Sequence, residues 1–246
     1  DLSKLRAGLP EAMELKRVLM EKGAWSQYLE VGIGPDAEIF TKSQIMSSVG
    51  HGMEAGLNPV STWNNPEPEV VVDVASSGRI VGATLGNDVN LRDVEGRSAL
   101  LLGKAKDNNA SCAVGPMIRL FDATFTLDDV RRMQLALKVE GEDGYVLNGA
   151  SNMSKISRDP ADIVGQMIGP NHQYPDGAIL FLGTLFAPVE DRDAPGKGFT
   201  HKLGDIVTVS SPELGTLANR MTSCEKAAPW TYGASHLMRN LAKRGL

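Results

Sequence analysis

The chain has 246 residues, enough for one large domain, and its 42% hydrophobic and 22% charged residues are ordinary for a globular protein. The formal net charge of −5 argues against a nucleic-acid partner, because phosphate binding leaves a basic footprint. No apolar run approaches the ~20 residues that span a bilayer, so we expect no membrane partner. The two cysteines make no disulfide framework, so we expect a reducing, cytoplasmic setting.

The N-terminal quarter is predicted to combine a helix with irregular chain. Residues 10–29 favour a helix, because Pro10 suits a first helical position and apolar residues recur near helical spacing. Residues 31–65 contain many glycines and predict loops joined by short extended pieces. The sequence begins at Asp1, without a methionine or a signal peptide, so we expect an upstream part of the natural polypeptide.

From residue 67 onward, short runs of β-branched and alternating residues predict strands separated by turns. The predicted strands are 69–74, 79–85, 135–140, 145–147, 178–183 and 205–209, with a short apolar piece at 117–120 and turns at 76–78 and 142–144. Helices are predicted near 94–102, after the capping-box residues 126–129, at 159–169, and as a basic amphipathic segment at 236–244. Strands outnumber helices, so we expect a mainly β or α+β fold in one domain.

Three carboxylates are predicted to converge at the start of the first hairpin. Glu67 and Glu69 are two residues apart, so their side chains share one strand face. If Ser77 and Gly78 form a two-residue loop, Asp88 lies directly opposite Glu67, with Cβ atoms ~5 Å apart. Like charges so placed are destabilising unless a cation lies between them.

The oxygen-only set Glu67, Glu69 and Asp88 favours a hard divalent cation, Mg²⁺ with Mn²⁺ or Ca²⁺ as alternatives, over zinc. The spacing alone favours acids on a solvated sheet face, because two acids at this spacing are common. Pro68 has no N–H for a ladder, so we also expect a bulge or a sheet edge beside these residues.

Several strings in this order resemble the signature of the fumarylacetoacetate hydrolase superfamily. They are 40–42 (FTK), 65–71 (NPEPEVV), 86–93 (GNDVNLRD), 105–116 (AKDNNASCAVGP), 182–184 (LGT) and 203–205 (LGD). The resemblance implies a compact, rolled β-sheet with short helices, a concave active site and a homodimer or higher homo-oligomer. It also implies that residues 1–30 are a helical lead-in from a missing N-terminal part and 31–246 the metal-binding catalytic domain.

The same resemblance assigns roles to residues at the matching positions. It implies that Mg²⁺ is held by the three carboxylates already singled out, Glu67, Glu69 and Asp88. Lys106 would lie at the metal and the substrate, Lys42 would border the site, and Thr184 would contact the substrate. Arg92 would be a buried partner of the metal-site acids.

Within the superfamily the chain is most similar to the 2-keto-3-deoxypentonate dehydratases, through the strings 63–66 (WNNP), 92–98 (RDVEGRS) and 104–109 (KAKDNN). This resemblance implies a Mg²⁺-dependent dehydratase that converts a small 2-keto acid, 2-keto-3-deoxypentonate, into 2-oxoglutarate semialdehyde by way of an enolate held by the metal. Lys106, Glu95 and Arg92 are the catalytic candidates. The general base stays open between Glu95 and a metal-bound hydroxide.

Two other functions remain open from the sequence. One is a C–C bond hydrolase of an acylpyruvate, but members of that kind use a histidine upstream of the FTK position, and this chain has none before His51. Glu95 also stands where those enzymes have a glutamine. The other is a non-catalytic binding protein that a metal stabilises.

The remaining candidate motifs favour structural interpretations. Residues 32–37 fit a loose dinucleotide-binding fingerprint, but no alternating α/β pattern follows, so we expect a tight loop. The four histidines lack metal-ligand spacing and are expected to be structural or exposed, although His172 and His201 lie in loops that could reach a site. Cys112 is expected to be a small buried apolar residue.

Overall fold

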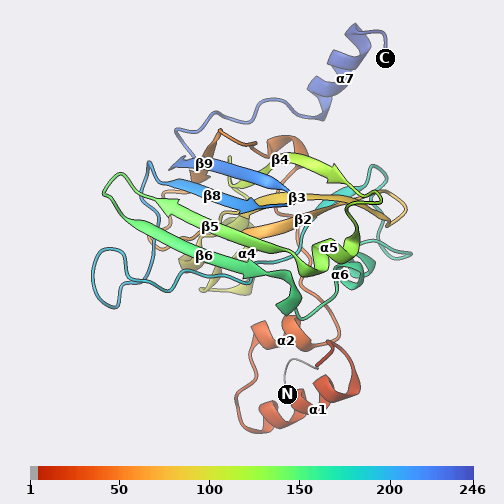
Figure 1. The fold of residues 1–246 in the computed structure, drawn as a ribbon, viewed down its shortest axis with the longest axis vertical. Helices are drawn as coiled ribbons and strands as arrows, with labels where there is room; N and C mark the ends of the chain where they lie inside the picture. The colour runs from red at the N-terminus through yellow and green to blue at the C-terminus, as the bar shows by residue number, and fades with distance from the viewer. Residues whose placement is uncertain (1–4) are drawn as a thin grey trace.

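The computed structural model describes residues 5–246 as two sheets with short helices around them (Figure 1). The helices are α1 (Pro10–Glu21), α2 (Gln27–Ile33), α3 (Arg92–Glu95), α4 (Leu102–Lys106), α5 (Leu127–Arg132), α6 (Pro160–Met167) and α7 (Ala234–Lys243), with 3-10 turns η2 (Ile45–Ser47), η3 (Ala99–Leu101) and η4 (Met153–Lys155). The strands are β1 (Glu54–Leu57), β2 (Pro68–Val74), β3 (Ile80–Asp88), β4 (Cys112–Leu120), β5 (Gln134–Glu140), β6 (Val146–Asn152), β7 (Ala178–Phe181), β8 (Ile206–Ser211) and β9 (Gly215–Ser223). The predicted α+β class is confirmed.

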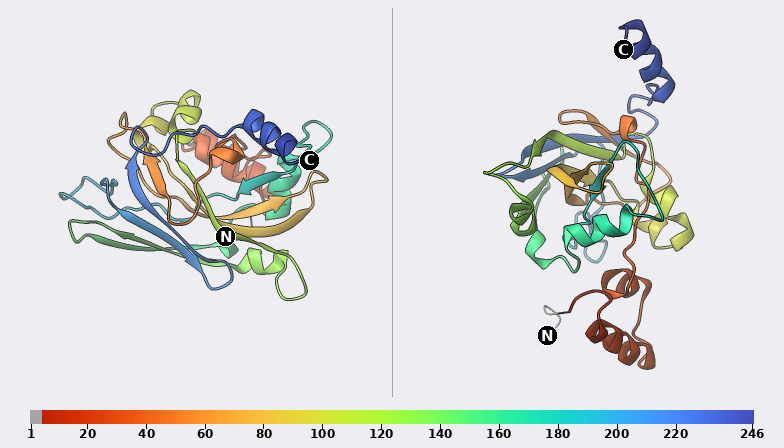
Figure 2. Two further views of the ribbon diagram at one scale, coloured as in Figure 1. Left: turned by 90° about the horizontal axis from the view of Figure 1, so that it is seen from above. Right: turned by 90° about the vertical axis from the view of Figure 1, so that its right-hand side faces the viewer.

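One sheet has the strand order β1-β9-β8-β5-β6 and the other β4-β3-β2-β7. All named pairs are antiparallel except β1 with β9. The view from above in Figure 2 shows the yellow strands β2 and β3 of the smaller sheet facing the green and blue strands of the larger one. Apolar side chains from both sheets fill the space between them in one continuous core.

Strand β2 alternates its residues between that core and the opposite face of its sheet. Val70, Val72 and Val74 belong to the inter-sheet core. Glu67 and Glu69 have the other parity, so their side chains point away from this core. The acidic side chains at the start of this buried strand therefore face a site on the other side of the sheet, although Val71, which has the same parity, is apolar.

The helices at the two ends of the chain stand apart from the sheets. Figure 1 and the side view in Figure 2 show α1 and α2 below the sheets and α7 above them. None of the side chains of α7 is buried, and no helix among the described residues is long and apolar enough to cross a membrane.

Several predicted boundaries were wrong for local reasons. The helix expected at 10–29 is two helices, because Gly23 adopts a left-handed φ of 64° that ends α1. The helix expected near 94–102 is divided into α3, η3 and α4, where Ser98 caps η3. Strands β1 and β9 and the first half of β4 were not predicted, because their sequences are short or polar.

The first hairpin has the predicted register but not the predicted loop. Val74 pairs with Ile80, and a bulge at Asp73 and Val74 then restores the expected pairing down to Pro68 opposite Asn87. No bulge occurs at Pro68, where β2 pairs regularly with β3, but the alternative expectation of a sheet edge is met on the other side, because β7 pairs only with residues 71–74. The segment 32–37 ends helix α2 instead of beginning one, so it is the expected tight loop.

Candidate metal centre and cavity

The structure brings Glu67, Glu69 and Asp88 together at the open end of the β2–β3 hairpin. The Asp88 amide donates to the Glu67 carbonyl at 3.0 Å, so the two residues are directly opposite. One carboxylate oxygen from each of the three residues lies within 4.8 Å of the others. Gly86, opposite Glu69, leaves room beside them for Phe181, whose ring would lie 2.3 Å from an added Cβ.

Two buried lysines contact these acids. Lys106 Nζ lies 2.5 Å from Glu67 Oε2 and 3.2 Å from Asp88 Oδ2. Lys42 Nζ lies 2.7 Å from Asp88 Oδ1 and donates to the carbonyl oxygens of Val89, at 3.0 Å, and of Lys106. Lys42 was expected only to border the site, yet the structure places its ammonium group against one of the three carboxylates.

The electrostatics of the cluster favour protons or a cation over three free anions. Burial, together with the charge of Asp88, raises the pKa of Glu67 to about 7, although Lys106 opposes the rise. Burial and the charges of Asp88 and Glu67 raise the pKa of Glu69 well above its usual range. Burial disfavours the charged form of Lys106, but Glu67 and Asp88 outweigh it and raise the pKa of this lysine.

These residues fit a divalent cation. Asp88 Oδ1 is buried without a hydrogen-bond donor, because the nearby Lys42 ammonium group lies outside hydrogen-bonding geometry. The two lysines also leave one of the three carboxylate charges unbalanced. Carboxylate oxygens grouped in this way are the ligands that Mg²⁺, Mn²⁺ or Ca²⁺ prefer.

Asn90 links the cluster to Glu95 and was not singled out in the sequence. Its amide nitrogen Nδ2 donates to Glu67 Oε1 at 3.0 Å and to Glu95 Oε2 at 2.6 Å. Asn90 is itself fixed by backbone hydrogen bonds to Asn65 in both directions. The string 86–93 contains Asn90, so this residue could have been singled out from the sequence as a short polar side chain close to Asp88 and Glu95.

Within the described residues Arg92 is not paired with the metal-site acids as expected, whereas the substrate contact expected of Thr184 stays a prediction. The Arg92 guanidinium stacks on the Trp63 ring at 4.9 Å and donates to the Pro188 carbonyl, and it forms no ion pair within the described residues. Thr184 lines the cavity, but its hydroxyl bonds the carbonyls of Pro68 and Phe186 at 3.1 and 3.0 Å.

A cavity of about 520 Å³ opens in front of the carboxylates. Its polar wall includes the three acids, Lys42, Lys106 and Glu95, and its apolar wall comes from β7, α6 and the segment 39–45. Glu38 lines the same cavity and was missed, because it lies in a stretch without regular structure. Glu38 is exposed, yet the protein around the cavity partly desolvates its carboxylate, and this desolvation and the charge of Glu95 raise its pKa against a lowering by Lys106.

The histidines do not line this cavity in the described chain, as expected for structural residues. His51 accepts from the Ala218 amide, and His201 is buried beside Asp205. Cys112 is buried as expected, and burial raises the pKa of its thiol. It also lines the cavity.

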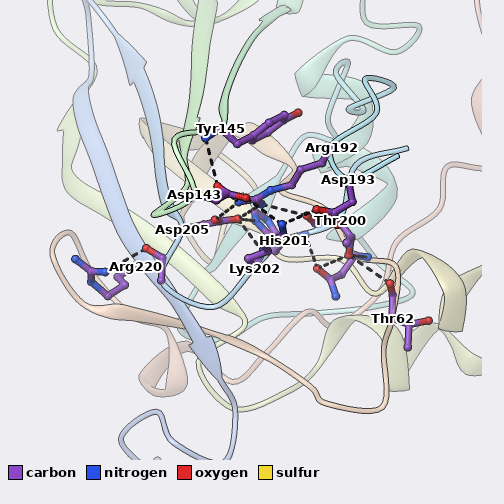
Figure 3. Close-up of polar contacts among 12 residues, drawn as sticks. Thr62, Asp143, Tyr145, Arg192, Asp193, Thr200, His201, Lys202, Asp205 and Arg220 are labelled. Carbon is purple, nitrogen blue, oxygen red and sulfur yellow. Dashed lines mark hydrogen bonds and ion pairs between the residues drawn. The ribbon is translucent and has the colours of Figure 1, made fainter. Parts of the chain in front are cut away.

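A second buried polar cluster lies around Asp205 (Figure 3). Arg192 holds both carboxylate oxygens, at 2.6 and 2.7 Å, and His201 Nδ1 lies 3.2 Å from Oδ2. The His201 amide donates to the Asn64 side chain, so the cluster is tied to the segment that leads into β2. Burial alone would favour neutral Asp205, but Arg192 and His201 lower its pKa to about 2.

Replacing Arg192 with methionine should cost roughly 3–5 kcal/mol of unfolding free energy at pH 7, because it leaves a buried carboxylate unpaired. The pKa of Asp205 is depressed, so its stabilising contribution is present near neutrality and is lost as the pH falls from about 4 toward 2. The difference between variant and parent should therefore shrink below pH 3 in urea titrations. Arg220→Met, which removes an exposed arginine paired with Glu142, is the control and should cost under about 1 kcal/mol. Equal losses in the two variants would contradict this assignment.

The chain matches the family model "Fumarylacetoacetate (FAA) hydrolase C-terminal" over residues 62–222. It is 33% identical over 183 residues to the 2-dehydro-3-deoxy-D-arabinonate dehydratase of Saccharolobus solfataricus, covering 73% of this chain and 57% of that protein. It is 29% identical over 196 residues to a probable 2-keto-3-deoxyxylonate dehydratase of Haloferax volcanii, covering 80% of this chain and 64% of the other. The chain thus spans about three fifths of the length of these relatives.

A solved structure gives the same result at the level of the fold. The 2-keto-3-deoxy-D-arabinonate dehydratase complexed with magnesium and 2,5-dioxopentanoate superimposes with a TM-score of 0.69 and 33% identity, over 80% of this chain and 66% of that one. The chain belongs to the fumarylacetoacetate hydrolase family, and the resemblance seen in its motifs is confirmed.

Proposed function

We propose that this chain is the metal-binding catalytic part of a Mg²⁺-dependent dehydratase that converts 2-keto-3-deoxypentonate into 2-oxoglutarate semialdehyde. The observation that carries the proposal is the grouping of Glu67, Glu69, Asp88 and Lys106 on one wall of a cavity of about 520 Å³. Similarity to the two dehydratases supports it. The related structure with magnesium holds 2,5-dioxopentanoate, which is the same compound as the proposed product.

Glu67, Glu69 and Asp88 would hold the cation. When bound, Mg²⁺ would supply Lewis-acid polarisation of the substrate's 2-keto group. Lys106 would neutralise the substrate carboxylate and the negative charge that develops on its oxygens when the C3 proton leaves. Lys42 would keep Asp88 and the carbonyl of Lys106 in place, since it contacts both.

Glu38 is proposed as the base that takes the C3 proton. Its carboxylate lines the cavity and has no hydrogen bond within the described residues, whereas Glu95 is already bound to Asn90. A raised pKa brings Glu38 closer to neutrality, where a carboxylate base is most effective. Glu95 is proposed to protonate the C4 hydroxyl as it leaves, so that one water departs, five carbons remain, and tautomerisation gives the aldehyde.

The test of this function is a panel of 2-keto-3-deoxy sugar acids and acylpyruvates with Mg²⁺, with products identified by mass. We expect the pentonate to give a product lighter by one water, and to carry deuterium at C3 when the reaction runs in deuterated water. Cleavage of acylpyruvates with the pentonate untouched would instead establish the C–C hydrolase. Tight Mg²⁺ binding without exchange of C3 protons in any 2-keto acid would establish a binding protein.

Glu38→Gln should lower kcat about 100-fold, because removal of a general base typically costs 10²–10⁴-fold. The dissociation constant for Mg²⁺ should stay within about twofold of the parent value, since Glu38 is not among the grouped carboxylates. The rise of kcat/KM with pH, which reports a deprotonated base, should flatten in the variant. Asp36→Asn, two residues away and exposed, is the control and should keep the parent rate. Parent activity in Glu38→Gln would exclude Glu38 as the base.

The homodimer expected from the sequence stays a prediction. The apolar face of α7, which includes Leu237 and Met238, is exposed, and an isolated helix of this length is marginal in water. The helix also carries Arg239 and Lys243 and no acid, while the chain is acidic as a whole, so a second copy is an electrostatically suitable partner. Light scattering of the parent and of Leu237→Ser/Met238→Ser should show an oligomer and a monomer respectively.

A further inference from the structure

Glu38 lies in a stretch that has no helix or strand to hold it. Helix α2 ends at Ile33, and regular structure resumes only at η2. On the downstream side, Lys42 fixes the chain through its contacts with Asp88 and the carbonyls of Val89 and Lys106. The position of Glu38 therefore depends on how the upstream side, residues 31–37, is held.

The buried guanidinium group of Arg158 forms hydrogen bonds to the backbone of the upstream segment, residues 31–37. Its Nη2 donates to the carbonyls of Val31, Gly34 and Asp36 at 3.0, 2.7 and 3.0 Å, and its Nε donates to Val31 at 3.2 Å. The side chain is only 5% exposed, and its one ion-pair partner among residues 5–246, Asp162, is 3.7 Å away. A buried charge is tolerated only when it is well hydrogen-bonded, so these carbonyl contacts fix the loop and the arginine together.

Gln166 makes the last upstream contact before Glu38. Its Oε1 accepts from the Ala37 amide at 2.6 Å, one residue before the proposed base. The loop itself is tight, because a Cβ on Gly34 would lie 2.2 Å from the Glu30 carbonyl oxygen. The chain therefore has little freedom between the end of α2 and Glu38.

Arg158 and Gln166 are both fixed relative to the core by α6. Asp159 caps this helix and forms an ion pair with Arg131 of α5 at 2.6 Å. Ile163 and Met167, on the same helix, are buried members of the main hydrophobic core and also line the cavity. Helix α6, and with it Arg158 and Gln166, is therefore packed against the same core as the sheet that carries the carboxylates.

We infer that Arg158 and Gln166 are positioning residues that hold Glu38 at the cavity that it shares with Lys106 and the carboxylate cluster. The inference rests on the proposed function, in which Glu38 takes the C3 proton. Both residues act through the backbone of residues 31–37, and neither needs to touch the substrate. A loosened loop would leave the metal site intact and misplace the base, and a displacement of about 1 Å can cost a rate factor near 100.

The decisive comparison uses two changes at Gln166. Gln166→Met keeps the size and removes the acceptor for the Ala37 amide, whereas Gln166→Glu keeps an acceptor oxygen there. We expect Gln166→Met to lower kcat about three- to tenfold, with KM and the Mg²⁺ dissociation constant within twofold, and Gln166→Glu to restore most of the rate. Gln173→Met, which removes a glutamine that holds Gly169 and Pro170 instead, is the matched control.

Two measurements distinguish a positioning role of Gln166 from a role in the stability of the whole fold. Hydrogen exchange of amides in 31–41 should speed up in Gln166→Met and not in the two other variants. The acid limb of its kcat–pH profile should move to lower pH, because a released Glu38 gains solvent and leaves the field of Glu95 while Lys106 attracts it less. Arg158→Lys should behave like Gln166→Met with a larger loss, and the Gln166 pair decides the question if this variant does not fold.

The outcomes distinguish the inference from the proposed function. If the parent lacks dehydratase activity, the function fails and the positioning of a base fails with it, while hydrogen exchange still reports whether the loop is held. If the parent is active but Gln166→Met exchanges at the parent rate, the hold on the loop is refuted. Faster exchange with an unchanged kcat and pH profile would refute the positioning role alone.

Discussion

Lys106→Met is expected to lower kcat about 1000-fold, at the upper end of what losing one donor at a developing negative charge costs. Lys106 is 4% exposed and contacts both Glu67 and Asp88, whereas Lys42 contacts only Asp88, so Glu67 would lose its lysine partner among the described residues. Without metal, the variant should also lose about 3–5 kcal/mol of unfolding free energy, because a buried ion pair is broken from one side. Its affinity for Mg²⁺ should be retained or increased, since a positive charge near the cation has gone.

The control for this prediction is Lys104→Met, which changes an exposed lysine on the same helix, α4. It should keep the parent rate and stability within about 0.5 kcal/mol. Steady-state kinetics, urea titration and calorimetry of Mg²⁺ binding give the three quantities. Turnover at the parent rate in Lys106→Met would exclude this lysine from the chemistry.

Removing the divalent cation with a chelator is expected to abolish turnover and to lower the melting temperature strongly above pH 7 and only weakly at pH 5.5. At 100 times its dissociation constant a ligand stabilises by about 2.7 kcal/mol, which is about 5–10 °C for a chain of this size. The pH dependence follows from the raised pKa values of Glu67, to about 7, and of Glu69. Protons occupy these groups in the folded protein below those values and compete with the cation.

Proton linkage determines in which direction the metal-free stability changes with pH. A carboxyl group whose pKa is raised on folding binds more protons in the native state, so metal-free stability falls as the pH rises from about 4.5 through 7. Glu69→Gln and Asp88→Asn should lose the response to Mg²⁺, and Glu69→Gln should melt higher than the metal-free parent at pH 8. Asp73→Asn, on the same strand but outside the cluster, should respond like the parent. If the melting temperature changed neither with the chelator nor with pH, no cation would bind to the cluster of Glu67, Glu69 and Asp88.

The convergence of the acids was predictable because it depends on local rules. Strand periodicity put Glu67 and Glu69 on one face, and hairpin pairing put Asp88 opposite Glu67. The predicted loop was wrong, yet the pairing held because the bulge at Asp73 and Val74 compensates for it. No periodicity argument could have found that compensation, since bulges depend on how a strand packs against its neighbours.

Residues joined across long stretches of chain were not predictable. Arg92 follows Asp88 closely in sequence and was expected to pair with the acids, but it stacks on Trp63 and donates to the Pro188 carbonyl, with Glu67 and Glu95 near enough to act on its charge. Glu38 carries no motif, and only the folding of 31–45 over the cavity makes it a neighbour of Glu95 and Lys106. The same holds for the contacts of Arg158 with the loop before Glu38.

The sequence by itself determined the fold class, the family and the three carboxylates, because strand alternation, turn chemistry and short motifs act over a few residues. Only the tertiary structure decided that Lys42 contacts Asp88, that Arg92 stacks on Trp63, and that Glu38 shares a cavity with the cluster. These outcomes depend on charges and side chains brought together from distant segments. Their energies, such as the burial that raises the pKa of Glu67, exist only once the sheets have packed and water has left the site.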